Sequence, residues 1–237
     1  MAKRLHNLAL RRRLRRWLSP YASLNELDRL IERDHPEVLR RGMYYVEAGA
    51  NDGLSQSNTY FLERKYAGRG VLVEPAPHRF ADLVRNRSKK NYFARCALVP
   101  FGYPDKEVPM LYADLMSVAF INSESDLNKD RAAIISSAAP HLRGSETPFD
   151  FSAPARTLND ILGEAEAPSV VDLLSLDVEG NELNVLCGVD FSRYRFRHML
   201  VEARDEARMT AFLGERGYHM VAQLSHHDYL YRNDSAD

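Results

Sequence analysis

The hydrophobic pattern of this chain consists of short, continuously apolar runs separated by segments of helical composition. Apolar strands without polar alternation are covered on both faces, and their alternation with helices is typical of a parallel sheet. We therefore predict an α/β, Rossmann-like fold: a mostly parallel sheet with helices on both faces and an antiparallel C-terminal hairpin. The predicted strands are 43–49, 70–74, 92–99, a run from 170 into the acids near 177, and 198–202, with the hairpin at 218–224 and 228–232. The predicted helices between them are 55–66, 78–87, 181–188 and 206–216.

Two helices are expected before the first strand. Residues 1–20 predict a helix with a narrow apolar stripe surrounded by arginines. Residues 23–33 predict a second helix, because Ser23 and Glu26 have the spacing of a capping box. These helices make residues 1–42 an N-terminal extension of the main domain, 43–237.

Residues 100–153 interrupt the alternation and are rich in Pro, Ser, Asp and Asn. A connection of this length between core elements is usually functional. We expect it to form an insertion on the substrate side of the domain. Its predicted elements are strands near 107–113 and 117–121 and a helix at 126–138.

Charge is unevenly distributed along the 237 residues. Seven of the 32 basic residues precede residue 17, so the rest of the chain is acidic. The basic segment is compatible with an anionic membrane surface, with RNA, or with ordinary packing against a partner. The chain lacks an apolar run near the ~20 residues that span a bilayer, and its N-terminus lacks the apolar core of a secretory signal. We expect a cytoplasmic protein, with peripheral contact at the inner membrane face through residues 1–20 left open.

The segment 44–53, YYVEAGANDG, joins the first strand to its helix through a turn with two glycines. Such a strand–turn–helix unit places a ligand against backbone N–H groups. The spacing is E-x-G-x-x-x-G, and the acid Glu47 would repel a pyrophosphate. A ligand that carries positive charge, such as S-adenosylmethionine, suits this turn better. The cofactor-binding candidates here are Glu47, Gly49, Ala50, Asn51, Gly53 and Ser57.

Glu74 follows the second predicted strand, 21 residues after Gly53. An acid at this position binds the ribose hydroxyls of a nucleoside in dinucleotide folds, and it disfavours a 2′-phosphorylated cofactor. The neighbouring Pro75 is included as a cofactor contact. Cys96 and Ala97, at the end of the third predicted strand, are expected near the adenine edge.

Acids also follow the fourth and fifth predicted strands. Asp177 and Glu179 end the run that begins at Val170, and Glu202 ends the next strand. Carboxylates at the carboxyl ends of parallel strands meet at the ligand-binding edge of a sheet. They could deprotonate a hydroxyl, anchor the ammonium group of the cofactor, or hold Mg²⁺. Asp177 and Glu179 are the catalytic candidates, and all three acids are the metal candidates.

Several sequence blocks resemble the FkbM-type S-adenosylmethionine-dependent methyltransferases. The resemblance extends over about residues 43–232 and implies a class I methyltransferase sheet with O-methylation of sugars in glycolipids, polysaccharides or secondary metabolites. It also implies cofactor roles for the first turn and Glu74, and an active-site position for Asp177 and Glu179. Residues 1–20 and the details of 100–153 lie outside the common pattern. The blocks that carry it are YYVEAGANDG, SNTYFLE, GRGVLVEPAP, RTLNDIL, LLSLDVEGNELNVLCG and GYHMVAQLSHHDYLYR.

Three other functions were weighed against a sugar or glycolipid methyltransferase. A nucleic-acid methyltransferase would use the Arg-rich N-terminus, but the acidic body is poor for phosphate binding, and the D-V-E-G block differs from the Asn-Pro-Pro-aromatic motif that grips a flipped base amine. A dinucleotide oxidoreductase lacks its G-x-G-x-x-G. A non-catalytic cofactor-binding module would not need the acids at both strand ends. The sequence is compatible with an oligomer as well as with a monomer.

Overall fold

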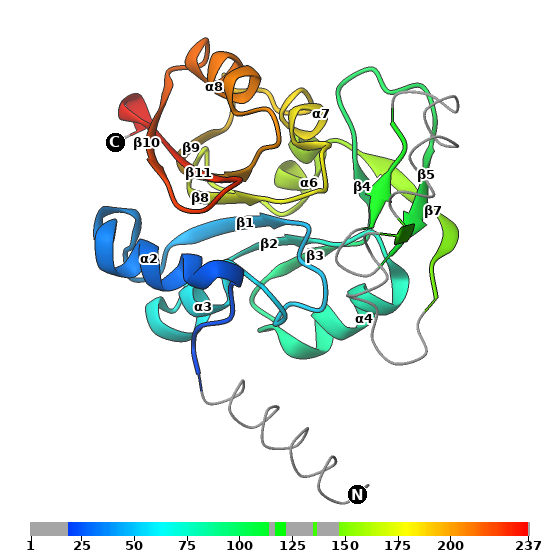
Figure 1. Cartoon of the computed structure of the whole chain (residues 1–237), viewed down its shortest axis with the longest axis horizontal. Helices are drawn as coiled ribbons and strands as arrows, with labels where there is room; N and C mark the ends of the chain where they lie inside the picture. The colour runs from blue at the N-terminus through cyan, green and yellow to red at the C-terminus, as the bar shows by residue number, and fades with distance from the viewer. Residues whose placement is uncertain (1–18, 114–116, 122–134, 137–146, 237) are drawn as a thin grey trace, which may run out of the picture.

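The computed structural model describes residues 19–113, 117–121, 135–136 and 147–236. Its centre is a seven-stranded sheet in the order β10-β11-β9-β8-β1-β2-β3 (Figure 1). The chain builds outward from β1 in both directions, so strand order reverses between β1 and β8. The strands of this sheet are β1 (Tyr44–Ala48), β2 (Arg69–Val73), β3 (Tyr92–Ala94), β8 (Val170–Leu176), β9 (Arg195–Glu202), β10 (Tyr218–Gln223) and β11 (Asp228–Asn233).

The strand directions confirm the predicted fold class. β1 pairs in parallel with both β2 and β8, and β9 continues the parallel set beyond β8. β11 then inserts antiparallel between β9 and β10, which gives the predicted C-terminal hairpin. All five residues of β1 are buried because this strand lies at the centre of the sheet.

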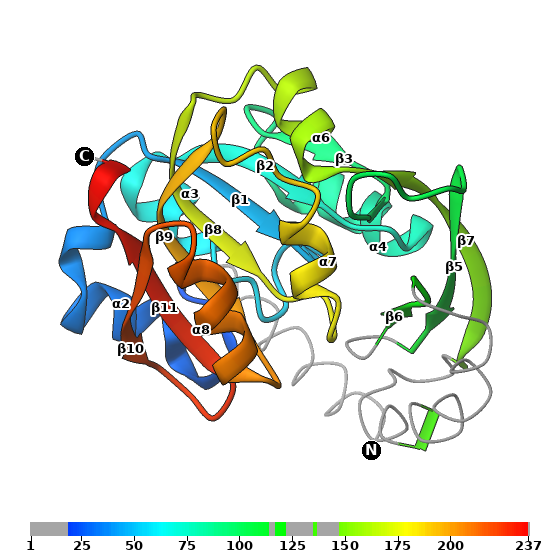
Figure 2. The same cartoon turned by 90° about the horizontal axis from the view of Figure 1, so that it is seen from above.

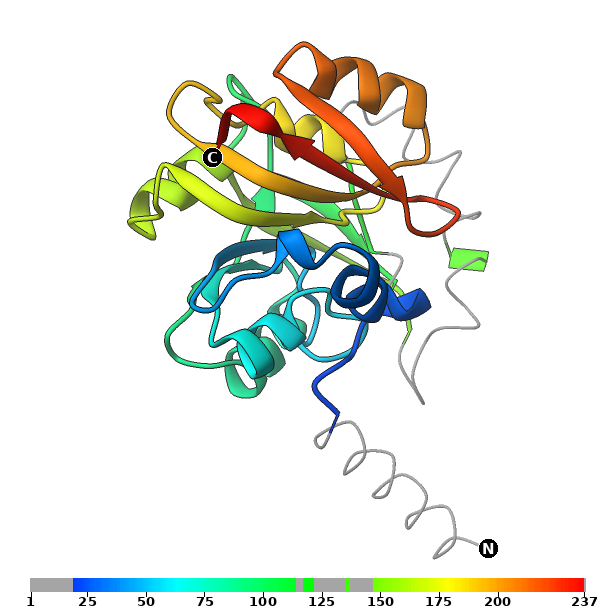
Figure 3. The same ribbon diagram turned by 90° about the vertical axis from the view of Figure 1, so that its left-hand side faces the viewer.

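Helices cover both faces of the sheet, as Figure 3 shows from the side. Phe61 and Leu83 belong to the helices of one face and pack with Tyr45 and Leu72 of the sheet. On the other face, Ile161 and its helical neighbours pack with Val46, Val71 and Leu174. The first face carries α2 (Leu27–Asp34), α3 (Tyr60–Tyr66) and α4 (Pro77–Asn86), and the second carries α6 (Leu158–Glu164), α7 (Glu182–Leu186) and α8 (Glu206–Gly214).

A second sheet stands beside the first, in the order β4-β7-β5-β6 (Figure 2). The single strand predicted at 92–99 is wrong, because the chain leaves β3 at Ala94 and enters the second sheet at Ala97. β7, which lies between β4 and β5 in this sheet, was not predicted. Of the helix predicted at 126–138, only residues 135–136 are described, and they are helical. The strands are β4 (Ala97–Leu98), β5 (Glu107–Tyr112), β6 (Val118–Ala119) and β7 (Phe149–Arg156).

The N-terminal segment enters the domain through a capped turn. The predicted partner of Ser23 is wrong: Ser23 Oγ accepts the N–H of Asp28 at 2.7 Å, and the Asp28 carboxylate accepts the N–H of Ser23 at 3.0 Å. The predicted helix therefore splits into a 3-10 turn, Leu24–Glu26, and α2. The basic helix predicted at 1–20 lies outside the described residues up to residue 18. Among the described helices, none has the length and hydropathy needed to cross a bilayer.

Candidate active site

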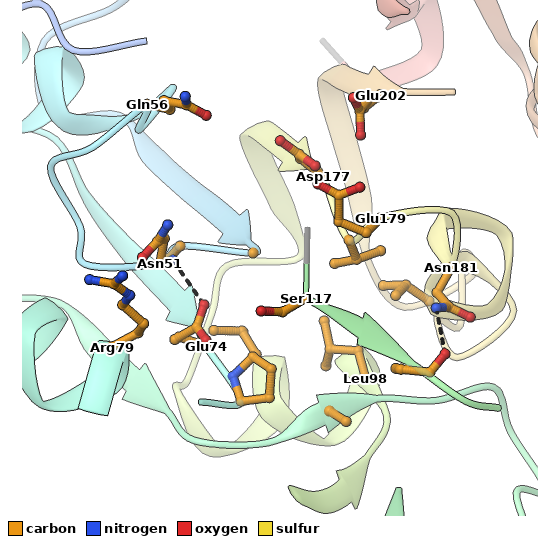
Figure 4. Close-up of a pocket in the computed structure, with 18 of the residues that line it drawn as sticks. Asn51, Gln56, Glu74, Arg79, Leu98, Ser117, Asp177, Glu179, Asn181 and Glu202 are labelled. Carbon is orange, nitrogen blue, oxygen red and sulfur yellow. Dashed lines mark hydrogen bonds between the residues drawn. The ribbon is translucent and has the colours of Figure 1, made fainter. Parts of the chain in front are cut away.

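A cavity of about 600 Å³ opens at the carboxyl ends of β1, β2, β8 and β9 (Figure 4). Each of these four strands either ends in a residue that lines the cavity or is followed directly by one. Ligands bind to open α/β sheets at this edge, where the strand order reverses. The residues in question are Gly49 after β1, Glu74 after β2, Asp177 after β8, and Glu202 at the end of β9.

The turn after β1 comes very close to the end of β8. Gly49 has φ of +88°, and a Cβ atom there would lie 1.8 Å from the backbone oxygen of Asp177. No side chain fits in that space, so Gly49 allows the two strand ends to meet at the cavity. Ala50 and Asn51 continue the lining, and Asn51 is itself left-handed, with φ of 47°.

Glu74 is held by backbone N–H groups on both sides. Its Oε2 accepts the N–H of Asn51 at 2.9 Å, and its Oε1 accepts the N–H of Ala76 at 2.8 Å. Burial raises the pKa of Glu74 to about 7, although these two hydrogen bonds oppose the rise. Each carboxylate oxygen retains acceptor capacity for a hydroxyl. Pro75, Cys96 and Ala97, which the sequence proposes as cofactor contacts, also line the cavity.

Glu47 lies behind the turn and does not line the cavity. Its carboxylate accepts hydrogen bonds from Ser57 Oγ at 2.9 Å, Thr59 Oγ1 at 2.7 Å and Arg87 Nη1 at 3.1 Å. The positive partner of Glu47 is therefore a buried arginine from the end of α4, where the sequence argument expected a cationic ligand. Glu47 shapes the loop that bounds the cavity.

Gly53, like Glu47, supports the loop from outside the cavity. A Cβ atom at Gly53 would lie 2.7 Å from both Arg87 Cγ and Leu83 Cδ1, and Gly53 does not line the cavity. Ser57 contributes to both regions, since it lines the cavity and donates to Glu47.

Three carboxylates converge on the opposite side of the cavity from Glu74 (Figure 4). Asp177, Glu179 and Glu202 each offer one oxygen atom, and these atoms lie within 4.8 Å of one another. Glu179 is held in a left-handed conformation, with φ of 56°, and its carboxylate accepts a hydrogen bond from Arg204 at 3.1 Å. The three acids therefore lie close together, as expected for residues at the carboxyl ends of neighbouring strands. A set of oxygen ligands at this spacing is chemically suited to a hard divalent cation.

Burial and the crowding of like charges raise the pKa values of two carboxyl groups in this cluster. Asp177 is open to the cavity, but the surrounding protein displaces much of its solvent, and this desolvation together with the charges of Glu202 and Glu179 raises its pKa well above the usual range. Burial and the charge of Glu202 raise the pKa of Glu179 to about 7, while Arg204 opposes the rise. Carboxyl groups that titrate near neutral pH are suited to exchange protons with a substrate.

Hydrogen bonds from neighbouring residues hold the acidic motif, residues 177–182, in its conformation. Glu182 Oε1 accepts the N–H groups of Val178 at 3.1 Å and Gly180 at 3.0 Å, so this acid holds the turn that precedes α7. Asn181 lines the cavity and donates to the backbone oxygen of Ala119 at 3.0 Å. That bond ties the acidic motif to the second sheet.

The sequence reasoning missed several lining residues. They come from segments whose approach to the cavity depends on long-range packing. Arg79 had one usable signal, its position one turn after the Glu74-Pro75 motif. The insertion that contains β5 was expected on the substrate side, but no single residue of it was predicted to line the cavity, and the N-terminal turn had no signal. The missed residues include Leu24, Gln56, Arg79, Met110, Ser117, Ala119, Asn181 and Arg204.

Two known proteins to which this chain is similar are both named as methyltransferases. A protein named Methyltransferase 1 from Beauveria bassiana (strain ARSEF 2860) is 28% identical over 153 residues, which cover 62% of this chain and 58% of that protein. Methyltransferase sdnD from Sordaria araneosa is 27% identical over 197 residues, 74% of this chain and 73% of that protein. The match therefore spans less than two thirds of the Beauveria protein.

A solved structure, the precorrin-6y C5,15-methyltransferase from Geobacter metallireducens GS-15, aligns with a TM-score of 0.45 and 12% identity over 89% of this chain and 91% of that one. The sequence profile of the methyltransferase FkbM domain matches residues 47–231. This range runs from the buried acid of β1 through β11 and includes Glu74 and the three clustered acids. The chain belongs to the FkbM methyltransferase domain family.

Proposed function

We propose that this protein is an S-adenosylmethionine-dependent O-methyltransferase whose acceptor is a hydroxyl of a sugar, in a glycolipid, polysaccharide or secondary metabolite. One observation carries the proposal: Glu74 and the carboxylates of Asp177 and Glu179 line one cavity from opposite sides. A nucleoside-binding acid and proton-accepting acids thus share a single space, as transfer of a methyl group to a hydroxyl requires.

The residues around Glu74 fit the cofactor. Glu74 would accept hydrogen bonds from the ribose hydroxyls, the backbone at Gly49 would allow close approach, and Cys96 and Ala97 would border the adenine. When bound, S-adenosylmethionine supplies a methyl group attached to a positively charged sulfur. The carboxylates across the cavity favour a cation at that place, because opposite charges attract strongly where water is scarce.

Asp177 and Glu179 would take the proton of the acceptor hydroxyl. Burial and neighbouring charges raise the pKa of Asp177 well above its ordinary value and the pKa of Glu179 to about 7. A base is most effective when its pKa lies near the working pH. Arg204 holds Glu179 by a hydrogen bond, so it fixes the direction in which this carboxylate faces the cavity.

Acceptor choice would fall to the walls outside the sheet. The described part of the 100–153 insertion contributes Met110, Ser117 and Ala119 to the cavity, in agreement with a role on the substrate side. A sugar acceptor is favoured over nucleic acid because three carboxylates at the cavity would repel phosphates. A cytoplasmic location goes with this proposal, since both donor and acceptor would be supplied there.

A divalent cation such as Mg²⁺ is a further candidate for the three clustered acids. In that case Asp177, Glu179 and Glu202 would hold it, and it would supply a positive charge that lowers the pKa of an acceptor hydroxyl. Chelation decides this point. Activity that EDTA removes and Mg²⁺ restores would assign the cation, and undiminished activity would exclude an essential exchangeable ion.

The function is tested by transfer of labelled methyl groups. The full chain is incubated with methyl-labelled S-adenosylmethionine and a panel of glycosides, polysaccharides, amines and RNA, and the products are separated by mass spectrometry. Label in a base-stable ether of a sugar acceptor is the expected result. Label confined to amines or RNA would overturn the proposal.

A further inference from the structure

Leu24 lies outside the region shared with the family, yet it lines the cavity. The FkbM profile begins at residue 47, whereas Leu24 belongs to the 3-10 turn that precedes α2. Its side chain is apolar and 52% exposed. The part of the cavity wall that this turn supplies therefore lies outside the residues that the family profile matches.

The turn is fixed in place by buried hydrogen bonds. Asp28 is 1% exposed, and its carboxylate accepts the N–H groups of Ala22 at 2.6 Å and Ser23 at 3.0 Å. Directly after the turn, Leu27 and Ile31 are buried in the core that also contains Phe61 of α3 and Tyr45 of β1. Leu24 is thus held at the cavity by a turn that is hydrogen-bonded on one side and packed into the core on the other.

The backbone of this wall adopts unusual conformations. Asn25 and Glu26 are both left-handed, with φ of 52° and 56°. These two residues reverse the chain so that Leu24 reaches the cavity while Leu27 enters the core. A parallel bridge joins Ser23 to Gln56, which is also left-handed, with φ of 62°, and lines the cavity. Left-handed conformations of residues other than glycine carry a cost and concentrate at functional sites.

Leu24 and Gln56 offer complementary chemistry. A leucine side chain that is half exposed gains free energy when an apolar ligand surface covers it. The Gln56 amide has both donor and acceptor groups for hydroxyls. In Figure 4, Gln56 stands across the cavity mouth from Glu202 and away from Glu74. Gln56 therefore lies away from the nucleoside-binding side of the cavity.

We propose that Leu24 and Gln56 form the acceptor-binding wall of the cavity and select glycosides that carry an alkyl group. The inference rests on the proposed function, because that function makes the second ligand a hydroxylated molecule. Leu24 contacts the alkyl group, and Gln56 hydrogen-bonds the sugar. An acceptor of this chemistry is a glycolipid or another amphipathic glycoside.

The test compares two probes on the full chain loaded with S-adenosylhomocysteine. Binding of octyl β-D-glucopyranoside, below its micellar concentration, and of methyl β-D-glucopyranoside is measured by ligand-observed NMR. The wild type is expected to bind the octyl glucoside about tenfold more tightly, the scale set by covering a half-exposed leucine. Leu24→Gln, which keeps the size of the side chain, removes the preference.

Phe101→Ala is the matched control, because Phe101 is an apolar side chain of 50% exposure that does not line the cavity. Its preference for the octyl probe is expected to equal that of the wild type. The proposal is overturned if the wild type has no preference, if Leu24→Gln keeps it, or if Phe101→Ala loses it equally. It is also overturned if Leu24→Gln weakens S-adenosylhomocysteine binding to the same extent, since Leu24 would then serve the cofactor. Intact probe selectivity without methyl transfer to any hydroxyl would overturn the proposed function and leave the wall in place.

Discussion

Nη1 of Arg87 and Oε2 of Glu47 lie 3.1 Å apart, and neither side chain is exposed beyond 4%. Arg87 also donates from Nε to Glu63 at 3.1 Å and from Nη2 to Tyr45 Oη at 2.8 Å. One guanidinium thus joins the end of α4 to β1, to α3 and to the loop between them. The loop that bounds the cavity depends on this buried ion pair.

Replacing Arg87 by methionine is expected to lower the free energy of unfolding by about 3–5 kcal/mol, because the carboxylate of Glu47 would be left buried without its positive partner. Urea denaturation followed by circular dichroism measures the change. Arg85→Met is the matched control on the same helix, since Arg85 is 73% exposed and should change stability by about 0.5 kcal/mol or less. Equal effects of the two substitutions would contradict a special role for the buried pair.

The position of Glu47 shows where sequence reasoning reached its limit. Successive strand residues point to opposite faces, so Glu47 necessarily shares a face with Tyr45. That face is covered by α3 and α4, where Tyr45 contacts Arg87. Nothing in the local sequence reveals that an arginine 40 residues later will be buried against this acid. The charge of Glu47 was correctly noticed, but its partner is set by tertiary packing.

Glu74, Asp177 and Glu202 were predictable for a different reason. Each follows or ends a recognisable apolar strand, and the carboxyl ends of parallel strands meet at one edge whatever the details of packing. The second sheet could not be predicted in the same way. Ala97 and Leu98 pair with residues 155 and 156, and a pairing over this separation leaves no local pattern in the chain.

Gly49→Ala is expected to weaken binding of S-adenosylhomocysteine by about 10²-fold, because a Cβ atom 1.8 Å from the backbone oxygen of Asp177 forces the two strand ends apart. Isothermal titration calorimetry measures the affinity. Gly42→Ala separates this clash from backbone strain, since Gly42 also has positive φ, +73°, but has no atom within 4 Å of the added carbon. Gly42→Ala should lose about 1 kcal/mol of stability and keep its affinity. Weakened binding in both variants would point to strain in place of the clash.

Cofactor affinity is expected to rise with pH through the pKa of Glu74, which lies at about 7. The ionised carboxylate accepts hydrogen bonds from two ribose hydroxyls, whereas the protonated group loses part of that capacity. Titrations of S-adenosylhomocysteine at about pH 6 and about pH 8 measure the effect. Glu74→Gln should bind weakly, and the Glu74 contribution to the pH dependence should vanish. A pH dependence identical to that of the wild type would remove Glu74 from the ribose site.

The same group affects stability with the opposite sign. Its pKa is about 7 in the folded chain against an ordinary value of 4.5, so between these pH values the folded protein retains a proton that the unfolded chain has released. The Glu74 contribution to stability therefore falls as pH rises through this window. The stabilities of the wild type and Glu74→Gln are compared by thermal unfolding at several pH values. The difference between the two stabilities should narrow below about pH 5, where both proteins are neutral at this position.

Asp177→Asn separates the two roles that its position at the end of β8 allows. If Asp177 takes the hydroxyl proton, turnover should fall by about 10²-fold or more while S-adenosylhomocysteine binds as before. If it anchors the ammonium group instead, affinity for S-adenosylhomocysteine should fall as well, because that product retains the ammonium. We expect the first result, since the pKa of Asp177, raised by burial and by the charges of Glu202 and Glu179, suits a proton acceptor. Asp105→Asn, at an exposed residue that does not line the cavity, controls for a change of charge alone. Steady-state turnover and calorimetry on the three proteins decide between the roles, and unchanged turnover in Asp177→Asn would exclude Asp177 as the base.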